Sequence, residues 1–294
     1  MSFLKNELSK YYDNDTVENI LLGLSSKRVS SFRVNTLKTS VDYVEKTLID
    51  NNIYYKKVPF YDSAFIVDNI SAVQNLDIYK NGFIYVQSLS SMIPPLVLEP
   101  NKKDTILDMC ASPGGKTTQM ATITNNEAHI TACEMNNIRI EKLKYNVDMQ
   151  GAKSVYVMSA DARTLDDFYS FDKILLDAPC SGSGTLDVSN DKYLKYFTPK
   201  LIEKSVKSQL ALIKKAVNIL KKGGVLVYST CSVLKAENEK VLESVLKEGN
   251  VVIENIDISS FSDIPTLSGL DGTLTVCPTE FYEGFFVAKL KKIK

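Results

Sequence analysis

The sequence predicts an α/β protein built on a doubly wound, mostly parallel seven-stranded sheet, preceded by a small N-terminal α+β subdomain. From residue 105 onward, short apolar runs alternate with helical stretches, which is typical of parallel strands joined by crossover helices. The last apolar run, GFFVAKL, comes long after the others. The expected strands are 105–110, 129–134, 154–161, 171–179, 223–231, 250–257 and 284–290.

Helical patterns fall between these strands, near 116–124, 136–150, 199–221 and 236–248. Thr198-Pro199 predicts the start of the third of these helices, because Thr caps a helix and Pro fits its first position. The KKGG that follows predicts that the helix ends on C-cap glycines.

Three regions are expected along the chain. Residues 1–80 open with a helical pattern at 2–24 and form a small α+β unit, and residues 81–104 are a connector that packs on the sheet. Residues 105–294 form the main domain, where ligands bind at the carboxyl ends of the parallel strands.

The composition excludes several classes of protein. The chain has 294 residues, 44% apolar and 24% charged, which is ordinary for a globular protein. No apolar run reaches the roughly 18 residues of a membrane span, and the N-terminus lacks the apolar region of a signal peptide. Five cysteines without a CxxC pair argue against a zinc site and a disulfide framework, so we expect no metal, reduced thiols and a cytoplasmic protein. They are Cys110, Cys133, Cys180, Cys231 and Cys277.

Charge is segregated although the net charge is zero. Residues 191–222 hold nine lysines against Asp191 and Glu203, whereas residues 237–283 hold ten acids against Lys240 and Lys247. A solvated helix face explains a lysine-rich segment, and contact with phosphates is the alternative. The lysines are 192, 195, 200, 204, 207, 214, 215, 221 and 222.

The segment LDMCASPGGKTTQMA (107–121) places a glycine-rich turn between a strand and a helix. Glycines let the backbone approach a ligand closely, and the helix N-terminus offers free N–H groups. Cys110 stands where a Walker A loop needs its first glycine, and GxGxxG is absent too. The alternative is a purely structural turn.

Acids end the next two strands. Glu134 lies 26 residues after Asp108, near the spacing at which an acid binds the ribose hydroxyls of a nucleotide-like cofactor. Asp161 ends the third strand, where it could hold the amino edge of an adenine. An acid at a strand end is common, but several in register after a glycine-rich turn predict a cofactor pocket.

Two cysteine motifs follow the next two strands, DAPCSGSG (177–184) and YSTCSV (228–233). A cysteine alone is usually a small buried hydrophobe. In a sheet ordered 3-2-1-4-5, however, the fourth and fifth strands are neighbours. Cys180 and Cys231 should therefore face one pocket.

Together DMCASPGGKT, DAPCSGSGT, YSTC and EGFFVAKL resemble the NOL1/NOP2/Sun family of RNA cytosine-5 methyltransferases, which use S-adenosyl-L-methionine. The resemblance covers roughly residues 30–290 and includes SFRVNTLK (31–38) and YVQSLSS (85–91). It implies a Rossmann-like methyltransferase domain and an RRM-like subdomain at 1–80 that contacts RNA. The late segment departs from the family, because Thr275 and Thr279 lie near places usually held by Arg and His.

The resemblance also implies residue roles. Cys231 is the nucleophile, Cys180 assists product release, and Asp177 faces both the cofactor and the target base. The implied cofactor contacts are Cys110, Ala111, Ser112, Pro113, Gly114, Gly115 and Lys116 at the methionine end, Glu134 at the ribose, Arg139 on the next helix, Asp161 at the adenine, and Asp177.

The implied substrate is a single-stranded or flipped cytosine of RNA, rRNA ahead of tRNA, and we expect a monomer. Three alternatives stay open. A DNA cytosine-5 methyltransferase would use the PC cysteine and lack the TC cysteine. A catalytically silent RNA-binding or ribosome-assembly factor would not need both cysteines, and neither would a small-molecule methyltransferase.

Overall fold

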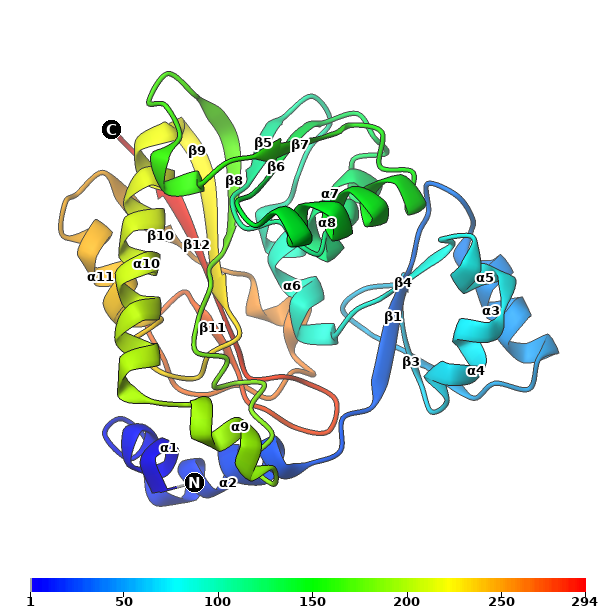
Figure 1. Cartoon of the computed structure of the whole chain (residues 1–294), viewed down its shortest axis with the longest axis horizontal. Helices are drawn as coiled ribbons and strands as arrows, with labels where there is room; N and C mark the ends of the chain where they lie inside the picture. The colour runs from blue at the N-terminus through cyan, green and yellow to red at the C-terminus, as the bar shows by residue number, and fades with distance from the viewer. Residues whose placement is uncertain (1) are drawn as a thin grey trace.

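The structure is a computed structural model of the chain and describes residues 2–294 (Figure 1). Residues 105–292 contain a large sheet, and residues 30–86 contain a small one. The side chains of residue 2 and of residues 191–193 are not among those described, so Lys192 of the lysine-rich segment lies outside the described side chains.

The large sheet contains all seven predicted strands and one more. They are β5 (Thr105–Asp108), β6 (His129–Glu134), β7 (Val155–Ser159), β8 (Phe171–Asp177), β9 (Leu220–Thr230), β10 (Val251–Glu254), β11 (Leu274–Val276) and β12 (Phe285–Lys292). The order is β10-β12-β9-β8-β5-β6-β7, so the predicted 3-2-1-4-5 arrangement is confirmed. Strands β5 to β9 are parallel, and β12 is antiparallel to its neighbours. The short β11, which the sequence patterns do not predict, pairs with β12.

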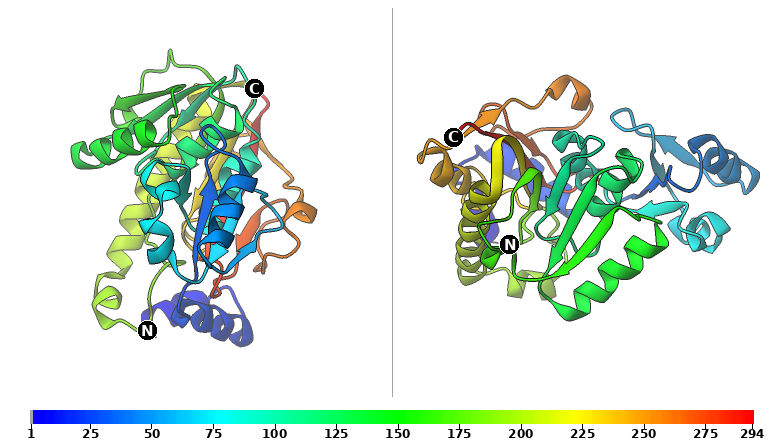
Figure 2. Two further views of the ribbon diagram at one scale, coloured as in Figure 1. Left: turned by 90° about the vertical axis from the view of Figure 1, so that its right-hand side faces the viewer. Right: turned by 90° about the horizontal axis from the view of Figure 1, so that it is seen from above.

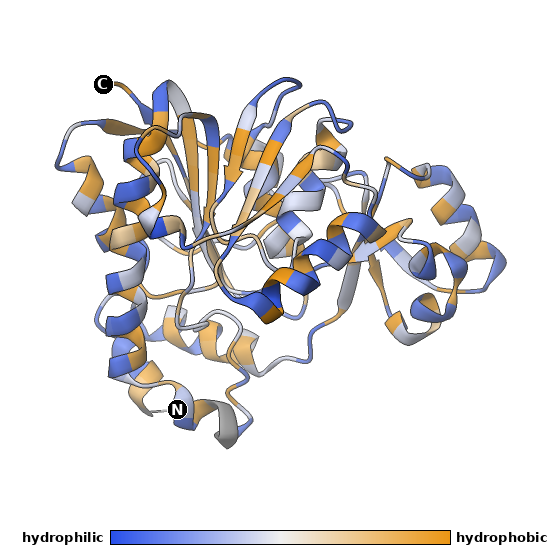
Figure 3. Cartoon of the chain, turned by 45° about the horizontal axis from the view of Figure 1, so that its top comes forward, coloured by the Kyte–Doolittle hydropathy of each residue, from blue (hydrophilic) through white to orange (hydrophobic). Residues whose placement is uncertain are grey.

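Helices cover both faces of this sheet (Figures 1 and 2). One face carries α6 (Leu89–Leu98), α7 (Gly115–Ile123) and α8 (Asn137–Met149), and the other carries α10 (Pro199–Ile219) and α11 (Glu239–Leu246). Successive strand residues point to opposite faces, so Ile106 joins the first core and Leu107 the second. Figure 3 shows the apolar residues concentrated along these strands. Each fully buried aliphatic side chain stabilises the fold by about 1.5–3 kcal/mol.

Helix α10 begins as predicted but ends differently. Thr198 caps it by accepting the backbone N–H of Leu201, and Pro199 takes the first position. The expected C-cap glycines are wrong, because the helix ends at Ile219 and the glycines lie inside β9. Lys292 of β12 donates its ammonium to three carbonyls at the end of α10, which supplies the missing cap.

The small sheet has the order β2-β3-β1-β4, with all its pairs antiparallel. Its strands are β1 (Ser30–Val34), β2 (Tyr55–Lys57), β3 (Ala64–Val67) and β4 (Ile84–Val86), and its helices are α3 (Val41–Asp50), α4 (Ile70–Asn75) and α5 (Asp77–Lys80). Phe32, Phe65, Val44 and Leu48 fill a separate core between this sheet and α3. The subdomain stands beside the large sheet in the view from above (Figure 2).

Two features differ from the expected division at residue 80. Strand β4 belongs to the small sheet although it lies within the expected connector. The first 25 residues form two helices, α1 (Ser2–Leu8) and α2 (Asn14–Ser25), because Asp13 caps a new helix. Leu4, Leu8 and Ile20 share a core with Val233 and Phe197 of the main domain, so these helices lie under α9 (Asp191–Tyr196) and α10 (Figure 1).

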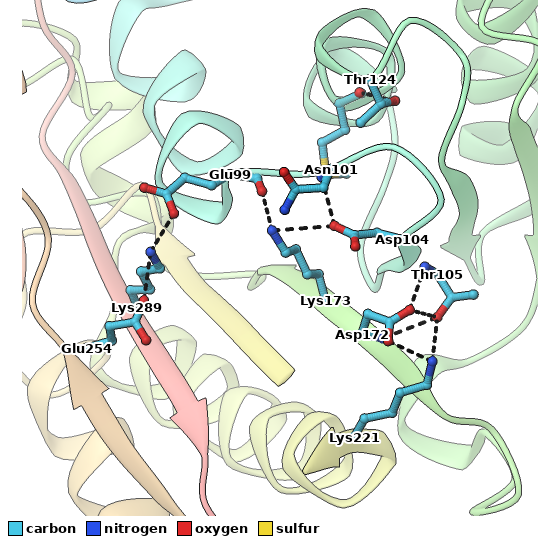
Figure 4. A network of polar contacts seen from close by, with 11 residues as sticks. Glu99, Asn101, Asp104, Thr105, Thr124, Asp172, Lys173, Lys221, Glu254 and Lys289 are labelled. Atoms are coloured by element: carbon cyan, nitrogen blue, oxygen red, sulfur yellow. Dashed lines mark hydrogen bonds and ion pairs between the residues drawn. The ribbon is translucent and has the colours of Figure 1, made fainter. Parts of the chain in front are cut away.

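A polar network ties the strand ends that lie opposite the carboxyl edge of the parallel strands (Figure 4). Asp172 accepts hydrogen bonds from the backbone and hydroxyl of Thr105 and from Lys221. Burial opposes ionisation, but these donors prevail and lower the pKa of Asp172 to about 2. Lys289 pairs with Glu99 and Glu254. These contacts stabilise the sheet at the end opposite the carboxyl edge of its parallel strands.

Candidate active site

The two cysteine loops meet where β8 and β9 end. These strands are parallel neighbours in which Asp177 pairs with Ser229, so the loops that follow leave the sheet side by side. Cys180 Sγ lies 3.1 Å from Cys231 Sγ. The hydrogen bond with Cys231 and burial raise the pKa of Cys180 well above its ordinary value. Cys180 is therefore a protonated thiol at neutral pH and can donate a hydrogen bond to the sulfur of Cys231.

A hollow of about 360 Å³ opens beside Cys231. The glycine-rich turn, the end of β8 and strand β4 of the small sheet form its walls. The lining includes Tyr85, Gln87, Ser91, Asp108, Cys110, Ala111, Ser112, Pro113, Gly115, Lys116, Asp177, Cys231, Glu283 and Phe285. The hollow thus lies at the carboxyl edge of the parallel strands, as predicted for a ligand site.

Glycines shape the turn that forms one wall. Gly114 has φ of +108°, a conformation that other residues rarely adopt, and it caps α7. A Cβ on Gly115 would lie 3.1 Å from the ring of Tyr85. The turn therefore brings backbone, rather than side chains, to the edge of the hollow.

Asp177 is held from two sides. Its Oδ2 accepts a hydrogen bond from Lys116 Nζ at 2.7 Å, and its Oδ1 accepts one from the hydroxyl of Ser229 at 2.7 Å. Lys116 also donates to Ser91 Oγ and lies over the ring of Phe285. The ammonium links α7, α6 and β8 at the floor of the hollow, which fixes the carboxylate in one orientation.

Asp108 ends β5 with one carboxylate oxygen still free. Its side chain is only 1% exposed, and Oδ2 accepts the hydroxyl of Thr117 at 2.7 Å. Oδ1 has no hydrogen-bond partner among the described residues. Burial raises the pKa of Asp108 to about 6, although Thr117 and Lys116 act against it. A buried carboxylate oxygen without a partner, on the wall of a hollow, suits a cationic group such as an ammonium.

Glu134, Ser112 and Arg139 form one connected group. Glu134 Oε1 accepts the backbone N–H of Met135 and Asn136, and Oε2 lies 3.4 Å from Arg139 Nε. The guanidinium of Arg139 donates to the backbone carbonyl of Ser112. In return, the hydroxyl of Ser112 donates to the backbone carbonyl of Arg139. The acid after β6 is thereby tied to the glycine-rich turn.

The predicted site residues do not all reach the same hollow. Cys110 to Pro113, Gly115, Lys116, Asp177 and Cys231 line it, whereas Gly114, Cys180, Glu134, Arg139 and Asp161 do not. Asp161 follows β7 and binds the guanidinium of Arg163. Burial, with the nearby Asp108 and Asp177, raises the pKa of Cys110 well above its ordinary value, which makes Cys110 a poor nucleophile.

Sequence reasoning misses several residues of the site. It counts Asp108 among the acids in register that predict a cofactor pocket, but it predicts no contact of Asp108 with the cofactor, although the position before the glycine-rich turn is a usable signal. Tyr85 and Ser91 lie in YVQSLSS, a segment of the family resemblance, but no role is predicted for either, because only packing brings β4 and α6 to the hollow. Thr279, at the departure from the resembled family, holds a turn by accepting the N–H groups of Phe281 and Tyr282.

Two other kinds of feature are absent from the described part of the chain. Within residues 2–294, no helix is both long and apolar enough to cross a membrane. In that same range, no cluster of three or more His, Cys, Asp or Glu side chains could hold a metal ion.

Known proteins resemble the chain in sequence and fold. The ribosomal RNA small subunit methyltransferase F of Shewanella loihica is 38% identical over 276 residues, which cover 90% of this chain and 56% of that protein. The tRNA (cytosine(72)-C(5))-methyltransferase of Pyrococcus horikoshii is 37% identical over 227 residues, which cover 76% and 56%. The chain thus spans a little over half the length of these relatives.

The fold is shared as well. A crystal structure of a methyltransferase homologue from Pyrococcus horikoshii superposes with a TM-score of 0.82 at 28% identity, and all of both chains is covered. The family model of 16S rRNA methyltransferase RsmB/F matches residues 95–291, which include both cysteine loops and the part of the hollow formed by residues 108–285. The chain therefore belongs to the RsmB/F family of methyltransferases, as its resemblance to the NOL1/NOP2/Sun enzymes predicts.

Proposed function

We propose that the protein methylates C5 of cytosine in RNA, with S-adenosyl-L-methionine as methyl donor and Cys231 as covalent nucleophile. One observation carries this proposal: the sulfurs of Cys180 and Cys231 lie 3.1 Å apart, and Cys231 lines the hollow that Asp108 and the glycine-rich turn enclose. Membership of a methyltransferase family supports the same reading.

The residues of the hollow suit this cofactor, which when bound supplies a methyl group on a positively charged sulfur. Asp108 Oδ1 would accept its ammonium group, because that oxygen is buried and has no partner among the described residues. The backbone of residues 110–116 would enclose the methionine end. Glu134 would hold the ribose and Asp161 the adenine, while Arg139 keeps Ser112 in place.

Cys231 would begin the reaction by bonding to C6 of the cytosine. C5 of cytosine is a weak nucleophile, and addition of a thiolate at C6 makes it electron-rich, so that one hard step becomes two easier ones. Asp177, oriented by Lys116 and Ser229, would hydrogen-bond the N3–N4 edge of the base. The base is thereby held with C6 toward the sulfur.

Release would follow methyl transfer. The C5 proton passes to water, its electron pair restores the C5=C6 double bond, and the C6–S bond breaks with its pair on Cys231. The protonated thiol of Cys180 can donate a hydrogen bond to that leaving sulfur. Cys180 would therefore assist release, while Cys231 attacks.

The RNA would approach over the end of α9 and the first half of α10. Lys195, Lys200, Lys204 and Lys207 are exposed, and none makes an ion pair with a described residue. Lys214 and Lys215, in the second half, pair with Glu248 and Asp167 instead. The lysine-rich segment is thus divided, and its unpaired half begins after the Cys180 loop.

We infer further that the small sheet contacts the RNA, since β4 lines the hollow. rRNA is the favoured substrate and tRNA the next. One relative that matches the chain is named as an rRNA methyltransferase and another as a tRNA methyltransferase. A monomer acting in the cytoplasm is the simplest form of this proposal.

Transfer of tritium from labelled S-adenosyl-L-methionine to RNA, DNA and free nucleosides tests the proposal. RNA should be labelled and yield 5-methylcytidine. Label in DNA alone would favour the DNA enzyme, and label in nucleosides a small-molecule enzyme. No transfer to rRNA or tRNA, with intact cofactor binding, would favour a silent RNA-binding factor.

A further inference from the structure

Glu237 lies between the two cysteine loops with no exposed surface. Its Oε1 accepts the backbone N–H of Ser181 at 2.7 Å. Its Oε2 accepts the hydroxyls of Ser181 and Ser232, each at 2.6 Å. Three hydrogen bonds to one carboxylate stabilise its charge without a cation, and a buried carboxylate needs such partners.

Each serine directly follows one of the two cysteines. Ser181 follows Cys180, and Ser232 follows Cys231, so one carboxylate holds both loops one residue beyond the sulfurs. The loops also meet where the N–H of Gly184 donates to the carbonyl of Cys231 at 3.0 Å. The distance between the sulfurs thus depends on bonds that converge on Glu237.

Glu237 is itself held in place. Its carbonyl accepts the hydroxyl of Tyr228 at 2.6 Å. Its neighbour Asn238 accepts the hydroxyl of Thr230 and donates to the carbonyl of Ser232. Because Tyr228 and Thr230 lie on β9, the carboxylate is anchored to the sheet rather than to a mobile loop.

We infer that Glu237 is a positioning residue, which holds the Cys180 thiol beside Cys231 so that the covalent intermediate can be released. The role in release rests on the proposed function. The hydrogen bonds by which Glu237 holds the two cysteine loops do not depend on that function. The hydrogen bond with Cys231 and burial raise the pKa of Cys180, and the negative charge of Glu237 raises it further. Cys180 therefore stays protonated.

Glu237→Gln is the sharpest variant. The amide has the same shape but only one acceptor oxygen, so at least one donor among Ser181 and Ser232 loses its partner. Glu239→Gln is the matched control. Glu239 is also buried, lies two residues further on, and makes no side-chain hydrogen bond among the described residues.

The first experiment measures the spacing of the sulfurs without any RNA. The oxidant diamide takes two electrons and two protons from a thiol pair as the disulfide forms, and mass spectrometry of peptides follows the Cys180–Cys231 bond. We expect Glu237→Gln to slow this bond about tenfold or more, because small misplacements have large effects on such reactions. Glu239→Gln should stay within about twofold of the unmodified protein. Equal rates for all three proteins would overturn the inference.

The second experiment measures release on RNA. In Glu237→Gln, kcat/KM for RNA and for the cofactor should stay within about twofold, while turnover falls about tenfold or more, because the slow step follows formation of the covalent bond. The protein–RNA conjugate should accumulate on denaturing gels. A parallel fall in kcat/KM, turnover and melting temperature, without conjugate, would show a merely structural role. If Glu237→Gln fails to fold, Ser232→Ala removes one hydrogen bond and is expected to change both readouts in the same direction.

The two experiments separate the two proposals. If no RNA is methylated by the unmodified protein but the disulfide slows in Glu237→Gln, the proposed function fails and the positioning role stands. If RNA is methylated and neither readout changes in the variant, the positioning role fails alone.

Discussion

Lys116 Nζ lies 2.7 Å from Asp177 Oδ2, so the first turn of α7 supplies a cation to the carboxylate that ends β8. The same ammonium donates to Ser91 of α6. This contact joins the proposed cofactor turn to the proposed base-binding acid, and several consequences of the site depend on it.

Lys116→Met should reduce methyl transfer about 100-fold, because Asp177 loses its orientation and this partly buried carboxylate is left without its cation. Single-turnover transfer to RNA measures the effect. Lys144→Met is the control, since Lys144 pairs with Glu141 on the exposed side of α8. Transfer within about threefold of the unmodified rate in Lys116→Met would contradict the role of this ion pair.

Cofactor affinity should depend on pH through Asp108. Its pKa of about 6 means that the carboxylate is charged above that pH and neutral below it. Binding of S-adenosyl-L-homocysteine, which carries the same ammonium group, should weaken about tenfold for each pH unit below 6. Calorimetry across pH measures this, and Asp108→Asn should bind weakly with a flat profile. A flat profile in the unmodified protein would exclude Asp108 as the ammonium ligand.

Arg33 should be essential for stability. This guanidinium is fully buried and donates to Gln87, Thr118 and the carbonyl of Gly115, with the ring of Tyr85 beneath it. Arg33→Met should lower the free energy of unfolding by about 2–4 kcal/mol, because several buried acceptors lose their donor. Urea unfolding measures this.

The exposed ion pair of Lys5 with Glu18 offers the comparison. Lys5→Met should cost less than about 1 kcal/mol. If Arg33→Met were no more costly than Lys5→Met, Arg33 would not join the small sheet to the turn at Gly115.

RNA binding should depend on salt through the free half of α10. Replacing Lys200, Lys204 and Lys207 with Gln should reduce the slope of log affinity against log salt by about 0.7 for each phosphate that the lysines no longer neutralise. Filter binding at several salt concentrations measures the slope. Lys214→Gln with Lys215→Gln is the control, since both lysines already pair with acids. Equal slopes for both variants would place the RNA on another surface.

The strand pattern was sufficient to predict that Cys180 and Cys231 meet. Apolar runs gave the strands, the 3-2-1-4-5 order made β8 and β9 neighbours, and both cysteines follow their strands at similar offsets. Local sequence patterns of this kind predict the structure up to the ends of the strands. They also predicted the start of α10, because capping depends only on neighbouring residues.

Local rules failed where distant residues replace local partners. The glycines of KKGG did not cap α10, because Lys292 does so from a strand far along the chain. Arg33 and Tyr85 lie in segments that carry the family resemblance, but those segments do not predict what the two side chains contact. These contacts, and those of Glu237, come from packing between separate elements. The association of α1 and α2 with Val233 is hidden for the same reason.

The most direct test of the central claim compares Cys180→Ala with Cys231→Ala on RNA and labelled cofactor. Cys180→Ala should form the Cys231–cytosine bond and resolve it slowly, so a labelled protein–RNA conjugate persists through denaturing electrophoresis. Cys231→Ala should give neither conjugate nor methylated RNA. Substantial methylation by Cys231→Ala, or a conjugate in that variant but not in Cys180→Ala, would contradict the assignment of the two sulfurs.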